Sequence, residues 1–210
     1  MPLLSLKSIK SQLHVGVWKL EESVESLLAL TELSEKERLY FSQIKNISRQ
    51  RQWLSCRVLL KKIYPKPIEI TYTPSGKPLT NMSSYHISIS HTAYYSAVIL
   101  AKGQAVGVDI ERIADRLKRI SPKMASGKER LMAASDKDKE LEHLTMIWCA
   151  KETIFKLCET QMLNFSEQIF VDINSLTEEG FFNVFLNQGK TTVFRLKKEK
   201  INDHILVYTL

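Results

Sequence analysis

Apolar and polar residues along the chain follow two different periods, and together they predict short strands interspersed with amphipathic helices. A period of two, typical of half-buried strands, marks segments in the first half of the chain and at its midpoint. These segments are His14–Lys19, Ile68–Thr73, His86–Ser90, Tyr94–Leu100 and Ala105–Ile110. Near the carboxyl end, polar turns separate four further segments that predict antiparallel strands: Glu167–Ile173, Phe181–Leu186, Thr191–Leu196 and Ile205–Tyr208.

Helical signals lie between these strands. Ser34 and Glu37 have the spacing of a capping box, which predicts that a helix begins there. We expect an interruption near residues 46–48, a resumption over Arg49–Tyr64 and an end at the following prolines. A short helix is expected around Glu22–Leu30, and residues 112–130 are expected to be helical in parts.

The clearest helical pattern surrounds Trp148. At about 100° per residue, the apolar side chains form one stripe, which we expect to face the core. The members of this stripe are Ile147, Ala150, Ile154, Leu157 and Cys158. Trp148, Glu152 and Lys156 follow one another on a neighbouring stripe, and Lys151 lies at the boundary between the two.

Three carboxylates are the first candidates for chemistry. Asp109 and Glu111 lie two apart on a predicted strand and therefore share a face, where they repel unless a cation lies between them. Carboxylates suit Mg²⁺ or Mn²⁺, so Asp109, Glu111 and Glu152 are candidate metal ligands, with Lys151 and Lys156 holding phosphate oxygens. The alternatives are a charged strand edge and an ordinary Glu–Lys pair on a helix.

Two further stretches suit phosphate binding. Lys77 lies between Gly76 and Pro78 in a turn-rich loop, where a stiff backbone presents its ammonium group. Ser90 and His91 end a predicted strand and can each donate a hydrogen bond to a phosphate. A hydrolase pair is not favoured, because no nucleophile elbow is present and adjacent strand residues point apart.

Composition limits the class of protein. The 210 residues are 44% hydrophobic and 25% charged, as in ordinary globular proteins, and no segment has the apolar run of a signal peptide or membrane span. Three cysteines without metal or redox spacing fit a reducing compartment, so we expect a cytoplasmic protein. The net charge of +7 predicts acidic partners, but no nucleic-acid module is recognisable and we expect no nucleic acid to bind.

The order of these patches resembles the 4'-phosphopantetheinyl transferase superfamily, in its two-repeat, surfactin-synthetase-activating type. Five separated patches carry the resemblance: Arg51, Gly76-Lys-Pro78, Ser90-His91, Asp109-x-Glu111 and Trp148-x-x-Lys-Glu-x-x-x-Lys156. The resemblance implies an α+β, pseudo-duplicated fold whose two similar halves, residues 1–104 and 105–210, each pack a helix on a small antiparallel sheet. The chain departs from the family at Met124-Ala125, where an aromatic pair is usual, while Glu129 stands at the expected acid.

The resemblance also implies an activity, the Mg²⁺-dependent transfer of 4'-phosphopantetheine from coenzyme A to a serine of an apo acyl or peptidyl carrier protein. The products are the holo carrier and 3',5'-ADP. In this interpretation Asp109, Glu111 and Glu152 hold Mg²⁺, and Glu152 or a metal-bound water accepts the serine proton. Coenzyme A contacts are expected from Lys36, Arg51, Lys77, Ser90, His91, Lys151 and Lys156.

The partner is expected to be an acidic carrier protein, with the basic run Arg112–Lys128 as its docking surface, and the enzyme is expected to be a monomer. Two alternatives stay open at this point. A Mg²⁺-dependent phosphohydrolase acting on a nucleotide or pyrophosphate would use similar groups, and a non-catalytic basic binding protein would keep only the fold.

Overall fold

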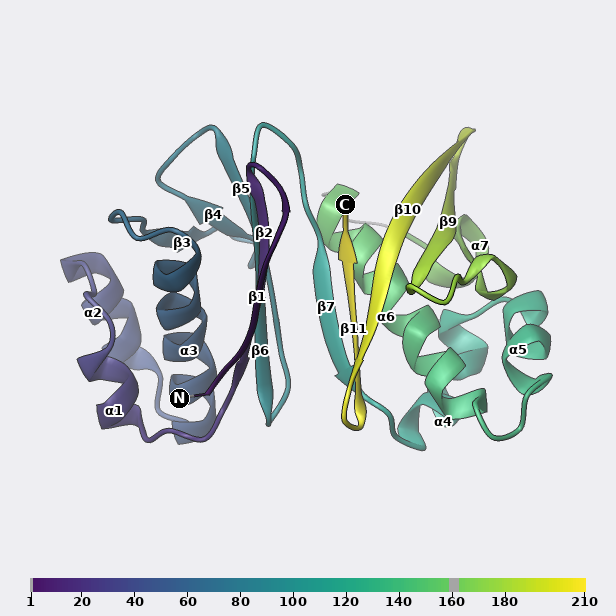
Figure 1. Ribbon diagram of the computed structural model, residues 1–210, viewed down its shortest axis with the longest axis horizontal. Coiled ribbons are helices and arrows are strands. Elements are labelled where there is room, and N and C mark those ends of the chain that lie inside the picture. Colours follow the sequence, from purple (N-terminus) through teal and green to yellow (C-terminus); the bar gives the residue numbers. More distant parts are fainter. Residues whose placement is uncertain (1, 159–162) are drawn as a thin grey trace. The chain divides into compact units, whose positions relative to one another are not determined.

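A computed structural model describes residues 2–158 and 163–210 of the chain. The polypeptide divides into two compact units, Met1–Val106 and Gly107–Leu210, each with its own hydrophobic core (Figure 1). Each unit is described by itself below.

The helices of the amino-terminal unit begin where short polar side chains cap them. The three helices are α1 (Val24–Ala29), α2 (Glu35–Gln43) and α3 (Ile47–Ile63). Ser34 and Glu37 form the predicted capping box at the start of α2. Asn46 accepts a hydrogen bond from the Arg49 amide and thereby starts α3, so the predicted interruption between the two helices is confirmed.

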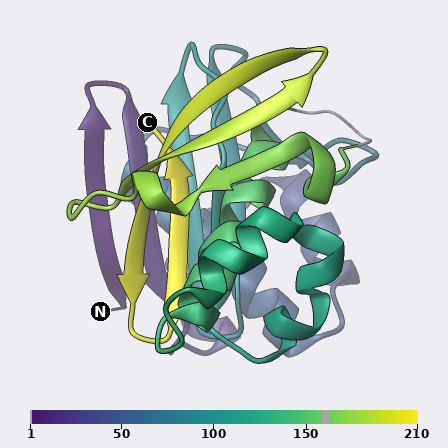
Figure 2. The same ribbon diagram turned by 90° about the vertical axis from the view of Figure 1, so that its right-hand side faces the viewer.

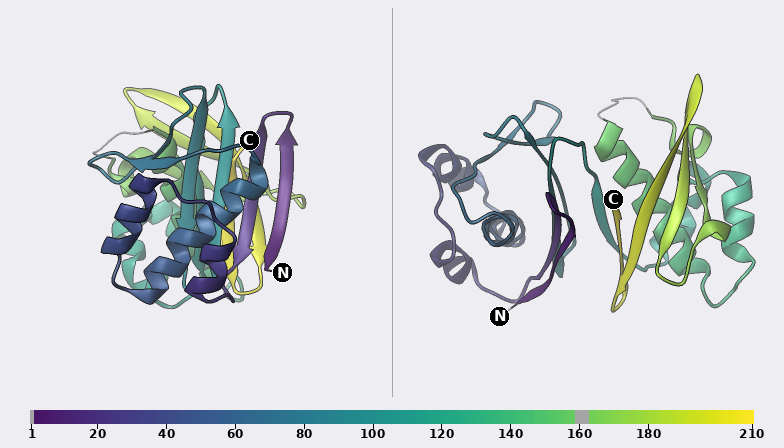
Figure 3. Two further views of the ribbon diagram at one scale, coloured as in Figure 1. Left: turned by 90° about the vertical axis from the view of Figure 1, so that its left-hand side faces the viewer. Right: turned by 45° about the horizontal axis from the view of Figure 1, so that its top comes forward.

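The sheet of the amino-terminal unit is antiparallel, in the order β1-β2-β6-β5. Its strands are β1 (Leu3–Lys10), β2 (Leu13–Lys19), β5 (Tyr85–His91) and β6 (Tyr95–Lys102). The hairpin of β3 (Ile70–Tyr72) and β4 (Pro78–Thr80) forms a separate two-stranded sheet. Helix α3 packs against β2 and β6, and the three helices cover one face of the larger sheet (Figure 3, left). Strand β1 is not predicted by the sequence pattern, because it is an edge strand whose exposed side chains follow no clear alternation.

The carboxyl-terminal unit is built on a five-stranded antiparallel sheet in the order β7-β11-β10-β9-β8. Its strands are β7 (Val108–Arg112), β8 (Ile169–Asp172), β9 (Phe181–Gln188), β10 (Lys190–Ile201) and β11 (His204–Thr209). The helices α4 (Arg116–Met124), α5 (Gly127–Ala134), α6 (Glu140–Cys158) and α7 (Phe165–Gln168) gather on one side of this sheet (Figure 2). A single 3₁₀ turn, η1 (Ile173–Ser175), follows β8.

The long helix α6 packs against β7 and β11 through its apolar stripe. Ile147, Ala150 and Ile154 are fully buried in the core of this unit, as their spacing predicted, while Leu157 and Cys158 are half-buried at its margin. The expected class of helices with antiparallel sheets is thus confirmed, and the pseudo-duplication stays a prediction. The segment predicted as a strand over Glu167–Ile173 begins as helix α7 and becomes extended only at Ile169.

Over the described residues, no helix is both long enough and apolar enough to span a lipid bilayer.

Candidate functional site

Asp109 and Glu111 lie on β7 and point toward the same face of the sheet. In the register of β7 with its neighbour β11, Asp109 lies opposite Val207 and Glu111 opposite Ile205. Val207 and Ile205 belong to the core that α6 covers, so the two carboxylates point to the side of the sheet on which α6 lies. The period of two predicted this shared face.

Lys156 connects α6 to β7. Its Nζ donates to Asp109 Oδ1 at 2.8 Å and to the Val108 carbonyl at 3.0 Å. The Asp109 side chain is 8% exposed and that of Lys156 is 26% exposed, so solvent reaches this ion pair from the lysine side. A partly desolvated ammonium group beside a carboxylate is suited to meet an anionic ligand.

Glu111 is oriented by the segment that follows β7. Its Oε1 accepts a hydrogen bond from the Arg112 amide at 3.0 Å, and its Oε2 forms an ion pair with Arg116 at the start of α4. Its side chain is 20% exposed. Both carboxylate oxygens of Glu111 therefore have partners.

Glu152, on α6, titrates unlike an ordinary glutamate. Burial and, to a smaller extent, the charges of Asp109 and Glu111 raise its pKa to about 7, against the opposing charge of Lys156. The negative charges of Asp109 and Glu111 on β7 therefore reach Glu152 on α6 and make its ionisation unfavourable.

The donor set matches the chemistry of a hard divalent cation, because Asp109, Glu111 and Glu152 offer only oxygen ligands. In the part of the chain that the structure describes, however, no three His, Cys, Asp or Glu side chains are gathered closely enough to hold a metal ion as they stand. Asp109 and Glu111 instead hold Lys156 and Arg116. Binding a cation would require these side chains to exchange partners, so metal binding remains a prediction.

Lys151 requires a correction. We expected its ammonium group to bind phosphate, but its side chain is fully buried and its Nζ lies 2.8 Å from Glu129 Oε2. The same Nζ donates to the Phe165 carbonyl at 2.6 Å. The helical period placed Lys151 at the boundary of the apolar stripe, and the structure places it inside, where a bound phosphate does not reach it. We therefore remove Lys151 from the coenzyme A contacts.

Gly107 allows β7 to lie close to α6 near these residues. A Cβ atom built on Gly107 would lie 2.2 Å from the carbonyl oxygen of Thr153, closer than real Cβ contacts allow. A backbone carbonyl in a helix has no freedom to move aside. The glycine is therefore required for the distance between the strand that carries Asp109 and the helix that carries Glu152.

Gly107→Ala is expected to destabilise the protein by roughly 2–3 kcal/mol, because the added methyl group forces β7 away from α6. Urea denaturation measures this loss. The matched control is Gly127→Ala at the first position of α5, where an added Cβ meets nothing within 4 Å; that variant is expected to gain stability slightly. Equal stabilities for the two variants would contradict the close approach at Gly107.

The candidate phosphate-binding residues of the amino-terminal unit lie at the end of β5. Ser90 is 7% exposed, whereas His91 is half-buried and its Nε2 contacts the guanidinium of Arg49 on α3. The sequence pattern predicts Arg51, and not Arg49, at this site. Two arginines two residues apart on a helix face different directions, and only the rotation of α3 against the sheet decides which of them meets His91.

Arg51 has a different set of partners. Its half-buried guanidinium donates to the Leu20 carbonyl at 2.6 Å and to the Glu22 carbonyl at 2.7 Å. It therefore fixes the connection between β2 and α1. Lys77 is half-buried in the turn between β3 and β4, where its amide donates to Thr73 Oγ1 and Gly76 has a positive φ of 85°.

Lys36 lies on the exposed face of α2 and lines a cavity of about 200 Å³. Aromatic rings form much of its wall: Tyr40 stacks on Trp53 and on Tyr72, with ring centroids 5.8 Å apart in each pair. The buried Trp53 Nε1 has no hydrogen-bond partner among the described residues.

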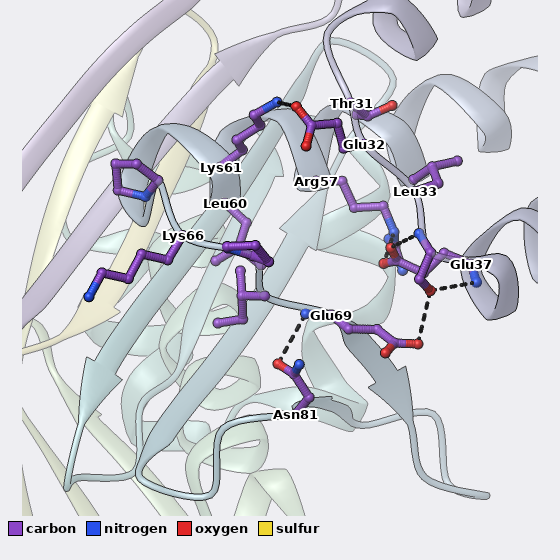
Figure 4. Close-up of a pocket in the computed structure, with 14 residues that line it drawn as sticks. Thr31, Glu32, Leu33, Glu37, Arg57, Leu60, Lys61, Lys66, Glu69 and Asn81 are labelled. Atoms are coloured by element: carbon purple, nitrogen blue, oxygen red, sulfur yellow. Dashed lines mark hydrogen bonds and ion pairs between the residues drawn. The ribbon is translucent and has the colours of Figure 1, made fainter.

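A larger cavity, of about 340 Å³, lies between α3, the start of α2 and the segment that leads to β3 (Figure 4). Its charged groups largely pair with one another: Arg57 with Glu37, and Lys61 with Glu32. Glu69 accepts a hydrogen bond from the Ser34 hydroxyl. Because most charged side chains of its wall pair with one another, we assign no ligand to this cavity.

Comparison with known proteins agrees with the geometry of β7 and α6. The family model of the 4'-phosphopantetheinyl transferase superfamily matches residues 105–209, which is half of the chain and nearly the whole carboxyl-terminal unit. The match includes Asp109, Glu111, Glu152 and Lys156. A search of curated proteins finds no match. On the extent of the family match, the chain belongs to the 4'-phosphopantetheinyl transferase superfamily.

Proposed function

We propose that this protein transfers 4'-phosphopantetheine from coenzyme A to a serine of an apo acyl or peptidyl carrier protein. The observation that carries the proposal is the group of acidic and basic side chains on β7 and α6, inside the region that matches the superfamily. Its members are Asp109, Glu111, Glu152 and Lys156.

The proposed reaction is a displacement at phosphorus. The serine hydroxyl oxygen attacks the phosphorus that carries the pantetheine arm, and the bond from that phosphorus to the bridging oxygen breaks. The new serine–phosphate bond holds the arm, and 3',5'-ADP leaves with the bridging oxygen. Glu152 accepts the serine proton as the general base.

Asp109, Glu111 and Glu152 would hold Mg²⁺, which offsets negative charge on the diphosphate when it is bound. Lys156 would then leave Asp109 and contact a phosphate oxygen, because its solvent-facing ammonium group can turn outward without crossing the core. This exchange of partners is the specific change that ligand binding requires of the chain.

We assign the nucleotide end of coenzyme A to residues of the amino-terminal unit, on the strength of the resemblance. Lys77, Ser90 and His91 would contact phosphates, and Arg49 joins them through its contact with His91. Lys36 borders a cavity with stacked tyrosines, and an aromatic wall suits an adenine ring. Arg51 would act mainly by fixing the backbone near the start of α1.

The carrier protein would dock on residues 112–128, which cover the end of β7, α4 and the start of α5. Exposed cations without a described ion pair on this stretch include Arg119, Lys123 and Lys128. A cluster of this kind would attract an acidic partner and raise its rate of association.

The test is intact-mass spectrometry of an apo carrier protein incubated with this protein, coenzyme A and Mg²⁺. We expect a mass gain of one phosphopantetheine that disappears with EDTA and in the variant Asp109→Ala. Release of 3',5'-ADP without a mass gain across several carriers would instead indicate a phosphohydrolase. If neither product forms and Asp109→Ala changes only stability, the protein is a binding protein.

A further inference from the structure

The ion pair between Lys151 and Glu129 joins several elements of the carboxyl-terminal unit at one buried point. Both side chains have no exposed surface, and Lys151 Nζ lies 2.8 Å from Glu129 Oε2. The same oxygen accepts from the Ser126 amide at 2.7 Å, and Oε1 accepts from the Val171 amide at 2.8 Å. Lys151 also donates to the Phe165 carbonyl at 2.6 Å.

These bonds tie four elements together. Lys151 belongs to α6, Glu129 to α5, Phe165 to α7 and Val171 to β8. A buried charge is tolerated only where hydrogen bonds and an opposite charge replace water. Burial lowers the pKa of Lys151, and the adjacent Glu129 carboxylate opposes that effect.

Lys151 directly precedes Glu152 on α6, so the two side chains diverge by about 100° around the helix axis. One ends in the buried ion pair, and the other lies within electrostatic reach of Asp109 and Glu111. The ion pair of Lys151 therefore fixes the rotation of α6 and its position along its own axis. These two together set the position of Glu152.

We infer that Lys151 is a positioning residue: its ion pair with Glu129 anchors α6 so that Glu152 faces β7. The inference rests on the proposed function for what Glu152 does, and on the buried contacts alone for what Lys151 does. It separates two adjacent residues of the Trp-x-x-Lys-Glu pattern into an anchor and a reactive group. Glu129 becomes the partner that the anchor requires.

The experiment compares Lys151→Met, Glu129→Gln and the double variant. Each single variant leaves a buried polar group without its partner and is expected to lower Tm by about 10 °C. The double variant removes the uncompensated charge, so its Tm loss is expected to be clearly smaller than the sum of the two. Lys139→Met, which breaks an exposed pair with Asp136, is the matched control and is expected to change Tm little.

Calorimetric binding of coenzyme A, measured well below each Tm, distinguishes an anchor from a phosphate contact. For an anchor, affinity falls in the single variants and recovers together with Tm in the double variant. A Lys151→Met protein with unchanged Tm and coenzyme A binding weakened tenfold or more, not recovered in the double variant, would overturn the inference.

Two fallback measurements keep the outcomes separate. If Lys151→Met does not fold, Glu129→Asp keeps the charge while shortening the side chain, and the same correlation of Tm with affinity is read from it. If the wild-type protein does not bind coenzyme A, the proposed function fails. Amide hydrogen exchange along α6 then tests whether the Lys151–Glu129 pair anchors this helix. Faster exchange in Glu129→Asp than in Lys139→Met supports the anchoring role, and equal exchange refutes it.

Discussion

Glu152→Gln is expected to lower the rate of phosphopantetheinyl transfer about 1,000-fold while making the metal-free protein more stable at pH 8. The first effect follows from the loss of the proposed general base. The second follows from the raised pKa of Glu152. Burial and the charges of Asp109 and Glu111 move this pKa from 4.5 to about 7, so the native state binds a proton that the unfolded state has lost between these pH values.

The stabilising contribution of protonated Glu152 is complete below pH 4.5 and is lost as the pH rises through about 7. At pH 8 the ionised side chain costs about 3 kcal/mol, which glutamine avoids. Opposite effects on activity and stability are typical of a residue retained for function.

Thermal denaturation in EDTA between pH 4 and pH 8 measures this difference. Glu142→Gln on the same helix is the matched control with the opposite sign. Burial raises the pKa of Glu142, but hydrogen bonds and charges from Lys198 and Lys200 outweigh burial and leave it lowered. That variant is expected to lose stability at pH 8. A Glu152→Gln protein that is less stable than wild type at pH 8 would contradict the raised pKa of Glu152.

Local signals in the sequence predicted those features that local physics determines. The capping box at Ser34 begins α2 because its two hydrogen bonds lie within one turn. Asp109 and Glu111 share a face because side chains alternate along any strand. The buried stripe of α6 follows from the helical period in the same way.

The remaining features depend on partners distant in the sequence. Lys151 is buried because Glu129, 22 residues earlier, neutralises it, and neither residue alone carries that information. Arg49 meets His91 because α3 packs on β2 and β6 with one particular rotation. Strand β1 forms an edge whose mixed exposure gives no period-two signal, and its pairing with β2 defines it. Tertiary contacts, and not local preference, decide all three.

Arg57→Ala is expected to destabilise the amino-terminal unit by about 3–5 kcal/mol, the second large effect. Arg57 and Glu37 are 6% and 7% exposed, and Arg57 Nε lies 2.8 Å from Glu37 Oε1. The guanidinium also donates to the Trp53 carbonyl at 3.2 Å and lies over the Trp53 ring, 3.1 Å from its centroid. Removing it leaves the Glu37 carboxylate buried without its cation.

The matched control is Lys61→Ala, one turn further along α3 and bordering the same cavity (Figure 4). Lys61 pairs with Glu32 at 2.7 Å, a shorter distance than that of the buried pair, but the two side chains are 44% and 85% exposed. Water and salt screen such a pair, so urea denaturation is expected to show little change. The two pairs have similar lengths and differ in burial, so we expect a large loss of stability in Arg57→Ala alone; comparable losses in both variants would refute burial as the cause.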